Sequence, residues 1–164
     1  PEQERDWRAL CPDQFALELA RTIVFGHQPL VGNLRMPHLT DEAYEEDVEF
    51  LVDVCRLYHA HRELLLWGTM LPPGRLECGE KDVRFLQRFL FTKPGEETFL
   101  VRPQPRVLHS AWRAPDGTAA LLLINWSRRD ARAVHFPTGW AGRVRARTGL
   151  IVRLPEHSSA GQSC

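Results

Sequence analysis

The chain has 164 residues, of which 43% are hydrophobic, and its formal net charge at pH 7 is zero. This apolar content can form the core of one domain, or of a small domain plus part of another, and it excludes disorder of the whole chain. The neutral total argues against a general attraction to nucleic acid or anionic membranes. We therefore expect no nucleic-acid partner. Because neither a signal peptide nor a membrane-spanning apolar run is recognisable, we also expect no membrane partner.

The first element that the pattern predicts is an amphipathic helix. Pro12 and Asp13 suit a helix start, because proline is tolerated in the first turn and an acid interacts favourably with the positive end of the dipole. Apolar residues then recur at helical spacing, as at Leu19 and Ile23, and Gly26 supplies a stop.

A short run comes next, FGHQPLVGNLRMPH at Phe25 to His38, with Leu30 and Val31 at its apolar centre. Its position between two helices favours a buried parallel strand over about Gln28 to Gly32. Helix, strand, helix is the alternation of α/β folds, whose strands are apolar because both faces are covered.

Three polar side chains lie after this expected strand: Asn33, Arg35 and His38. Ligands in α/β folds gather beyond the carboxyl ends of the strands, so these residues are our candidate substrate-binding site. Asn33 could hydrogen-bond a neutral ligand, Arg35 could anchor a carboxylate, and His38 could contact a ligand. The alternative, favoured for either residue alone, is that Asn33 and Arg35 satisfy loop backbone and cap the next helix.

A second, longer helix is expected after Thr40, which can cap it. Val48, Leu51, Cys55 and Tyr58 belong to one apolar stripe, so one side of this helix should pack and the other should face water. Acids crowd its first turns; because they point in several directions, we expect a solvated helix start and no catalytic pair. These acids are Asp41, Glu42, Glu45, Glu46, Asp47 and Glu49.

No metal site or cofactor site is predicted. His59 and His61 are two positions apart, so on a helix they project to different sides and cannot share one ion. The four cysteines are far apart and contain no C-x-x-C pair, which favours isolated thiols over a zinc site and leaves the redox compartment open. They are Cys11, Cys55, Cys78 and Cys164.

After Glu63 the pattern changes to short apolar runs separated by Pro and Gly turns, which is typical of an antiparallel sandwich or barrel. The clearest hairpin pairs Val107 to Arg113 with Thr118 to Trp126. The run Leu121 to Ile124 is expected to be a central strand covered on both faces, whereas Val83 to Phe91 fits a helix or a strand. The predicted division is 1–63, 64–154 and a flexible tail, 155–164.

Arginines and tryptophans in the second half leave two alternatives open. Arg143, Arg145 and Arg147 alternate with smaller residues, as on a strand with one solvent-exposed face. A basic stripe that binds an acidic polysaccharide or nucleic acid is the less favoured interpretation. Tryptophans could stack on sugar rings, although in or beside strands they more often belong to a core. These are Trp112, Trp126 and Trp140.

Three stretches carry a resemblance to a known family: FALELARTIVFGHQPLVGNLR at Phe15 to Arg35, YHAHRELLLWG at Tyr58 to Gly68, and SAWRAPDGTAALLLINWS at Ser110 to Ser127. Together they resemble the C-terminal part of α-galactosidase-like (β/α)8-barrel glycoside hydrolases and of related, uncharacterised bacterial glycosidase-like proteins. The family pattern P-L-hydrophobic-small-N-(D)-L-R is matched at Pro29 to Arg35, without the acid.

The resemblance implies an α+β chain: the terminal helix, strand and helix of a barrel, followed by an antiparallel β-sandwich. The family's catalytic carboxylates lie on earlier barrel strands, so it implies no catalytic residue here. The parent protein would be a glycoside hydrolase acting on carbohydrate through the missing barrel, and this chain alone would be inactive. The exposed remnant, around Leu30, Val31 and Val52, should self-associate or bind a missing segment. The alternative is a non-catalytic carbohydrate-binding or structural β-sandwich module.

Overall fold

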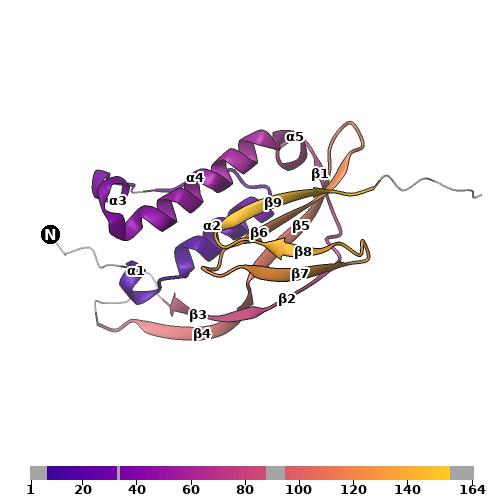
Figure 1. The fold of residues 1–164 in the computed structure, drawn as a ribbon. Coiled ribbons are helices and arrows are strands. Elements are labelled where there is room, and N and C mark those ends of the chain that lie inside the picture. Colours follow the sequence, from indigo (N-terminus) through magenta and orange to yellow (C-terminus); the bar gives the residue numbers. More distant parts are fainter. Residues whose placement is uncertain (1–6, 33, 88–94, 156–164) are drawn as a thin grey trace, which may run out of the picture.

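The computed structural model describes residues 7–32, 34–87 and 95–155 (Figure 1). The helices are α1 (Trp7–Leu10), α2 (Gln14–Val24), α3 (Met36–Thr40), the 3-10 turn η1 (Glu42–Tyr44), α4 (Glu45–Ala60) and α5 (Arg62–Leu65). The strands are β1 (Thr69–Leu71), β2 (Arg75–Cys78), β3 (Glu80–Gln87), β4 (Thr98–Pro105), β5 (Val107–Arg113), β6 (Ala119–Asn125), β7 (Ala131–Phe136), β8 (Ala141–Val144) and β9 (Thr148–Arg153).

The strands form antiparallel sheets that do not close into a barrel. One has the order β1-β5-β6-β9, a second has the order β2-β7-β8, and β3 pairs with β4. The α+β class is therefore confirmed. None of the helices in the described part of the chain has the length and apolarity that a bilayer crossing requires.

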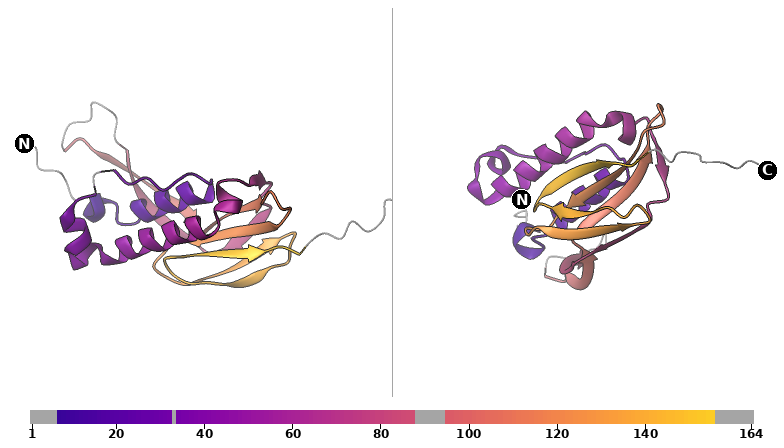
Figure 2. Two further views of the ribbon diagram at one scale, coloured as in Figure 1. Left: turned by 90° about the horizontal axis from the view of Figure 1, so that it is seen from above. Right: turned by 45° about the vertical axis from the view of Figure 1, so that its right-hand side comes forward.

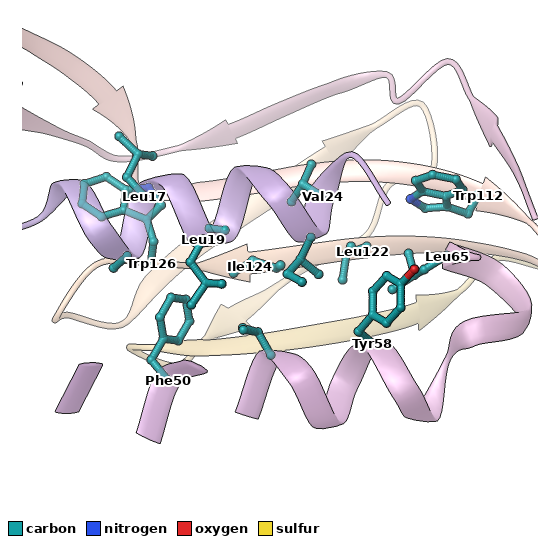
Figure 3. Close-up of a cluster of buried hydrophobic side chains, with 14 of the residues drawn as sticks. Leu17, Leu19, Val24, Phe50, Tyr58, Leu65, Trp112, Leu122, Ile124 and Trp126 are labelled. Atoms are coloured by element: carbon teal, nitrogen blue, oxygen red, sulfur yellow. The ribbon is translucent and has the colours of Figure 1, made fainter. Parts of the chain in front are cut away.

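Helices α2 and α4 lie side by side over one face of the four-stranded sheet (Figures 1 and 2). Phe50 and Tyr58 of α4 pack in one cluster with Leu122 and Ile124 of β6, and all four are almost inaccessible to solvent (Figure 3). On the other face, Leu123 of β6 joins a smaller cluster with residues of β5, β7 and β8. The sheet is thus covered on both faces, by helices on one side and by the second sheet on the other.

The predicted central strand is confirmed. Leu121 to Ile124 are completely buried, as expected for an apolar run with neighbours on both faces. The hairpin is also confirmed: β5 and β6 pair in register around Gly117, whose φ of 93° glycine tolerates without strain. The side chain of Asp116 accepts a hydrogen bond from the Thr118 N–H at 2.8 Å and fixes the turn.

The predicted strand at Gln28 to Gly32 is wrong. Residues 27–31 carry neither strand nor helix, and Leu30 is 91% exposed instead of buried. A strand needs a neighbour for its backbone groups, and this segment lies against α4, outside the three sheets. The apolar centre indicated burial, but of its two residues Leu30 is exposed and Val31 is only partly covered.

The second long helix begins later than predicted. Thr40 is the last residue of α3 instead of the cap of the long helix, and η1 separates α3 from α4. Asp41 provides the local cap, because its side chain accepts a hydrogen bond from the Ala43 N–H at 2.8 Å. The ambiguous stretch from Val83 becomes strand β3 up to Gln87; residues 88–91 and the tail after 155 lie outside the described residues.

Candidate functional site

The predicted substrate-binding residues lie around the start of α3. Arg35 is exposed in extended backbone at the N-cap position, and its N–H donates to Nδ1 of His38 at 3.2 Å. The His38 N–H in turn donates to the carbonyl of Arg35 at 3.0 Å. Asn33 lies outside the described residues. The contacts of Arg35 and His38 therefore stabilise a short helix start.

His38 also packs on an aromatic ring. Its ring centroid is 5.0 Å from that of Tyr44, edge to face, and the imidazole is half-buried. Because Nδ1 accepts the Arg35 N–H, Nε2 is the nitrogen left for a ligand. Neither Arg35 nor His38 lines the hollows between α4 and the segments 28–31 and 66–67.

A more extensive candidate is the outward face of the helical layer, away from the four-stranded sheet. A first hollow of ≈ 440 Å³ lies between the segment 29–31 and α4; it is lined by Pro29, Val31, Leu51, Val52, Cys55, Arg56 and His59. A second of ≈ 610 Å³ continues toward α5; it is lined by Gln28, Pro29, Cys55, Tyr58, His59, Arg62, Leu66 and Trp67. We call the residues lining these two hollows, together with Leu30, the outward surface.

Large apolar side chains are exposed on this surface. Leu30 is 91% exposed, Trp67 is 68% exposed and Val52 is 38% exposed. The neighbouring connection between α2 and α4 adds Phe25, Leu34, Met36 and Leu39, all of them exposed. Scattered exposed apolar residues are ordinary, but exposed apolar residues that line adjoining hollows, as Val52 and Trp67 do, are typical of an interaction surface.

The backbone beneath Leu30 also lacks partners among the described residues. Within that part of the chain, the carbonyl groups of residues 28–32 and their N–H groups, which Pro29 lacks, make no hydrogen bond. The anchors lie before the segment: Tyr58 Oη donates to the carbonyl of Gly26 at 3.4 Å, and the His27 N–H donates to the carbonyl of Thr22 at 2.9 Å. An extended, apolar segment with free backbone groups can accept a pairing strand.

The chemistry of the outward surface does not favour catalysis. The two hollows are lined by Arg56 and Arg62 as charged residues and by no carboxylate. Burial raises the pKa of the Cys55 thiol, so the thiol stays protonated at neutral pH and is a weak nucleophile. His59 is exposed, and the described residues hold no group of three or more side chains suited to a metal ion.

The acidic start of α4 is solvated in part: Asp41, Glu42, Glu45 and Glu49 are exposed, as predicted, whereas Glu46 and Asp47 are not. Asp47 is 7% exposed, and its Oδ1 lies 3.1 Å from Nη2 of Arg147, which is itself 7% exposed. Glu46 receives a hydrogen bond from Nε of Arg128 at 2.7 Å. Glu46 and Asp47 thus link α4 to the segments after β6 and β8. No local sequence pattern indicates this role, because the partners lie about 100 positions away in the chain.

Arg147 was also predicted wrongly, as part of a wet strand face. It lies between β8 and β9 with a φ of 50°, and its N–H donates to the carbonyl of Ser127 at 3.1 Å. Burial lowers the pKa of its guanidinium, while Asp47 and Glu46 oppose that effect. None of its side-chain nitrogens has a well-aligned hydrogen bond among the described residues, so the attraction to Asp47 is mainly coulombic.

The three tryptophans of the second half belong to the core or its edge, as the favoured interpretation predicted. Trp112 and Trp126 are buried at 6% and 0% exposure, and the indole N–H of Trp126 donates to the carbonyl of Pro105 at 2.8 Å. Trp140 is half-buried and packs against the smaller core cluster. Among the tryptophans whose burial the structure describes, the strongly exposed one is Trp67, which the strand-based argument did not include.

Comparison of the chain with protein-family models, with curated proteins and with solved structures finds no match.

Proposed function

We propose that this chain is the C-terminal part of a glycoside hydrolase. It contributes the last helix, extended segment and helix of a (β/α)8 barrel together with an accessory β-sandwich, and it supplies no catalytic carboxylate. The observation that carries the proposal is the outward surface: an apolar face of the helical layer beside an extended segment without backbone partners.

The arrangement of the helical layer supports this proposal. Phe50 and Val54 of α4 face the sheet, whereas Val52 and Cys55 face the outward surface. A helix of a (β/α)8 barrel packs on barrel strands along one stripe. If another domain covers its opposite side, the helix needs two apolar faces, and α4 has both.

Exposure of these groups has an energetic consequence. Covering a side chain such as Leu30 contributes roughly 1.5–3 kcal/mol relative to leaving it in water. A strand placed along Gln28 to Gly32 would also pair with backbone groups that have no hydrogen-bond partner among the described residues. Both gains favour a closing strand that becomes regular when its neighbour is present.

The coding sequence upstream of Pro1 tests the proposal. We expect several further β/α units whose strands end in Asp or Glu, since glycoside hydrolysis needs two carboxyl groups around the scissile bond. An upstream region without such units would contradict it. In addition, purified residues 1–164 should not hydrolyse aryl glycosides, and reproducible turnover would contradict the assignment of catalysis to the missing part.

A second candidate function is binding of a saccharide, which the exposure of Trp67 favours. An exposed indole can stack on a sugar ring, and Gln28, His59 and Arg62 line the same hollow with planar hydrogen-bonding groups. Titration with neutral oligosaccharides should then change tryptophan fluorescence, and Trp67→Ala should abolish the change. An equal response from Trp67→Ala would exclude this site.

A further inference from the structure

A third hollow, of ≈ 410 Å³, lies between α4 and the chain from β8 to β9, where α4 runs alongside β9 (Figure 1). It is lined by Asp53, Arg56, Leu57, Ala60, Arg143, Val144, Arg145, Thr148, Gly149 and Leu150. Its volume is in the range of small-molecule sites. We call it the basic hollow, because arginines outnumber acids among the residues that line it.

Aliphatic side chains line part of the basic hollow. Val144 is buried, Leu57 is partly buried and Leu150 is 37% exposed. A Cβ on Gly149 would lie 2.4 Å from Cδ2 of Leu57, so the glycine lets α4 approach β9 closely at this point. The hollow thus offers an apolar surface next to its charged groups.

The chain that forms the β8 and β9 side of the hollow carries more positive than negative charge. From Gly117 to Pro155 the acidic residue is Asp130. The arginines of the same stretch are Arg128, Arg129, Arg132, Arg143, Arg145, Arg147 and Arg153. Since Arg128 and Arg147 bind acids at the start of α4, Asp130 is the acid that this stretch has left for the others.

Asp130 does not neutralise the arginines of the hollow. Its Oδ2 forms an ion pair with Nη2 of Arg143, and its Oδ1 accepts a hydrogen bond from the Ala146 N–H at 2.8 Å. The register of β7 and β8 places Arg132 directly opposite Arg143, where like charges repel. Arg145 is exposed and forms no ion pair within the described part of the chain. Its charge is therefore available to an anion from solution.

On α4, Asp53 is the carboxylate that competes with such an anion. Its Oδ1 lies 3.7 Å from Nη1 of Arg56, and both side chains are at least half exposed. An exposed ion pair of this kind contributes little free energy, so exchange of one anion for another costs little. A ligand can therefore take the place of Asp53 beside Arg56.

The backbone that carries Arg145 is held in place by hydrogen bonds within the chain. Thr148 Oγ1 donates to the carbonyl of Arg145 at 2.9 Å, and Asp130 holds the N–H of the next residue, Ala146. Binding therefore has to order the side chain of Arg145 but not the turn beneath it. A guanidinium forms paired, charge-assisted hydrogen bonds with a carboxylate or a phosphate.

We propose that the basic hollow binds a small organic anion, about the size of a monosaccharide, through Arg56 and Arg145. The carboxylate or phosphate of the ligand pairs with these guanidinium groups, and its organic part lies against Leu57 and Leu150. Nucleic acid fits less well, because Asp53 lies in the hollow and no aromatic ring is among the lining residues for a base to stack on. The site shares Arg56 with the outward surface but does not rest on the proposed function.

NMR titration of the purified chain tests the proposal, with D-glucuronate, glucose 6-phosphate, glucose and inorganic phosphate as separate probes. We expect saturable amide shifts in residues 53–57 and 145–150 with glucuronate, glucose 6-phosphate or both, and none with glucose; the probe that binds identifies the anionic group. Arg145→Met should weaken binding at least about tenfold. Arg153→Met, at an exposed arginine at the end of β9, should not weaken it, and neither should Trp67→Ala on the outward surface.

Removal of the competing carboxylate should have the opposite effect. Asp53→Asn should tighten binding about twofold to fivefold, whereas Asp82→Asn, the same change of charge at an exposed site on β3, should not. Absence of saturable shifts with both organic anions, or equal binding by Arg145→Met, would overturn the proposal. Inorganic phosphate that binds as tightly as glucose 6-phosphate would overturn the role given to Leu57 and Leu150. A single-stranded oligonucleotide that binds more tightly than both organic anions would overturn the choice of a small ligand.

Discussion

The two sides of the helical layer carry similar side chains but differ in what covers them. On the inner side, Phe50 and Val54 lose nearly all contact with water against the four-stranded sheet. On the outer side, Val52 remains 38% exposed, and Leu30 of the neighbouring segment remains 91% exposed. A helix with two apolar sides needs a partner on each side if both are to be buried, and the described chain supplies a partner on one side only.

The largest effect should come from the same substitution made on the two sides. Leu122→Ala removes a completely buried side chain from the sheet side and should lower the free energy of unfolding by about 2–5 kcal/mol. Leu30→Ala should change it by less than about 0.5 kcal/mol, because the side chain is already in water. Urea denaturation of both variants measures the contrast, and equal losses would contradict it.

Removal of the ion pair between α4 and the segment after β8 should cause the next largest loss in the free energy of unfolding. Arg147→Met leaves the carboxylate of Asp47 buried without its closest cation and should cost roughly 2–3 kcal/mol in urea denaturation. Arg145→Met, two positions away at an exposed site, is the matched control and should cost less than about 0.5 kcal/mol. A neutral Arg147→Met would mean that apolar packing alone holds α4 in place.

The pH dependence of stability extends the comparison to the layer on the other face of the sheet. Since burial lowers the folded pKa of His109 on β5, its contribution is fully present above pH 6.5 and is lost as the pH falls from 6.5 toward the folded value. Chemical denaturation should show this loss, and it should be smaller in His109→Gln. Hydrogen bonds lower the pKa values of Asp116 and Asp130, so their contributions disappear only below pH 3.8.

The smallest predicted contrast is in the reactivity of two cysteine thiols. Cys55 on the outward surface is half-buried, whereas Cys11 is 5% exposed, and burial raises the pKa of both thiols. Iodoacetamide at neutral pH should therefore modify both slowly, and Cys55 before Cys11, as peptide mapping by mass spectrometry can show. Faster modification of Cys11 would indicate that its end of the inner core opens more readily than the outward surface.

Local pattern predicted those elements whose partners are close in the chain. The hairpin was predictable from the Asp116-Gly117 turn and the central strand from Leu121 to Ile124, because turn chemistry and pairing lie within twenty positions. The helix α2 was predictable from its apolar spacing. Local physics was sufficient in all three cases.

The candidate site was harder to predict, because its features depend on distant partners or on a missing one. Arg147 alternates with small residues, as an exposed strand residue does, yet its side chain is buried in an ion pair with Asp47. Leu30 and Val31 resemble a buried strand, and nothing in the described chain pairs with them. The local sequence pattern shows that the segment is apolar, but it does not show which other segment covers it.

Light scattering over a range of concentrations, with an apolar dye as a second readout, tests most directly whether the outward surface is a docking face. We predict dye binding and an apparent mass that rises with concentration for the unsubstituted chain, and loss of both in a Leu30→Asp, Val52→Asp double variant. Val101→Asp, at a 58% exposed site on β4, should leave both unchanged. A monomer at all concentrations that binds no dye would contradict the account.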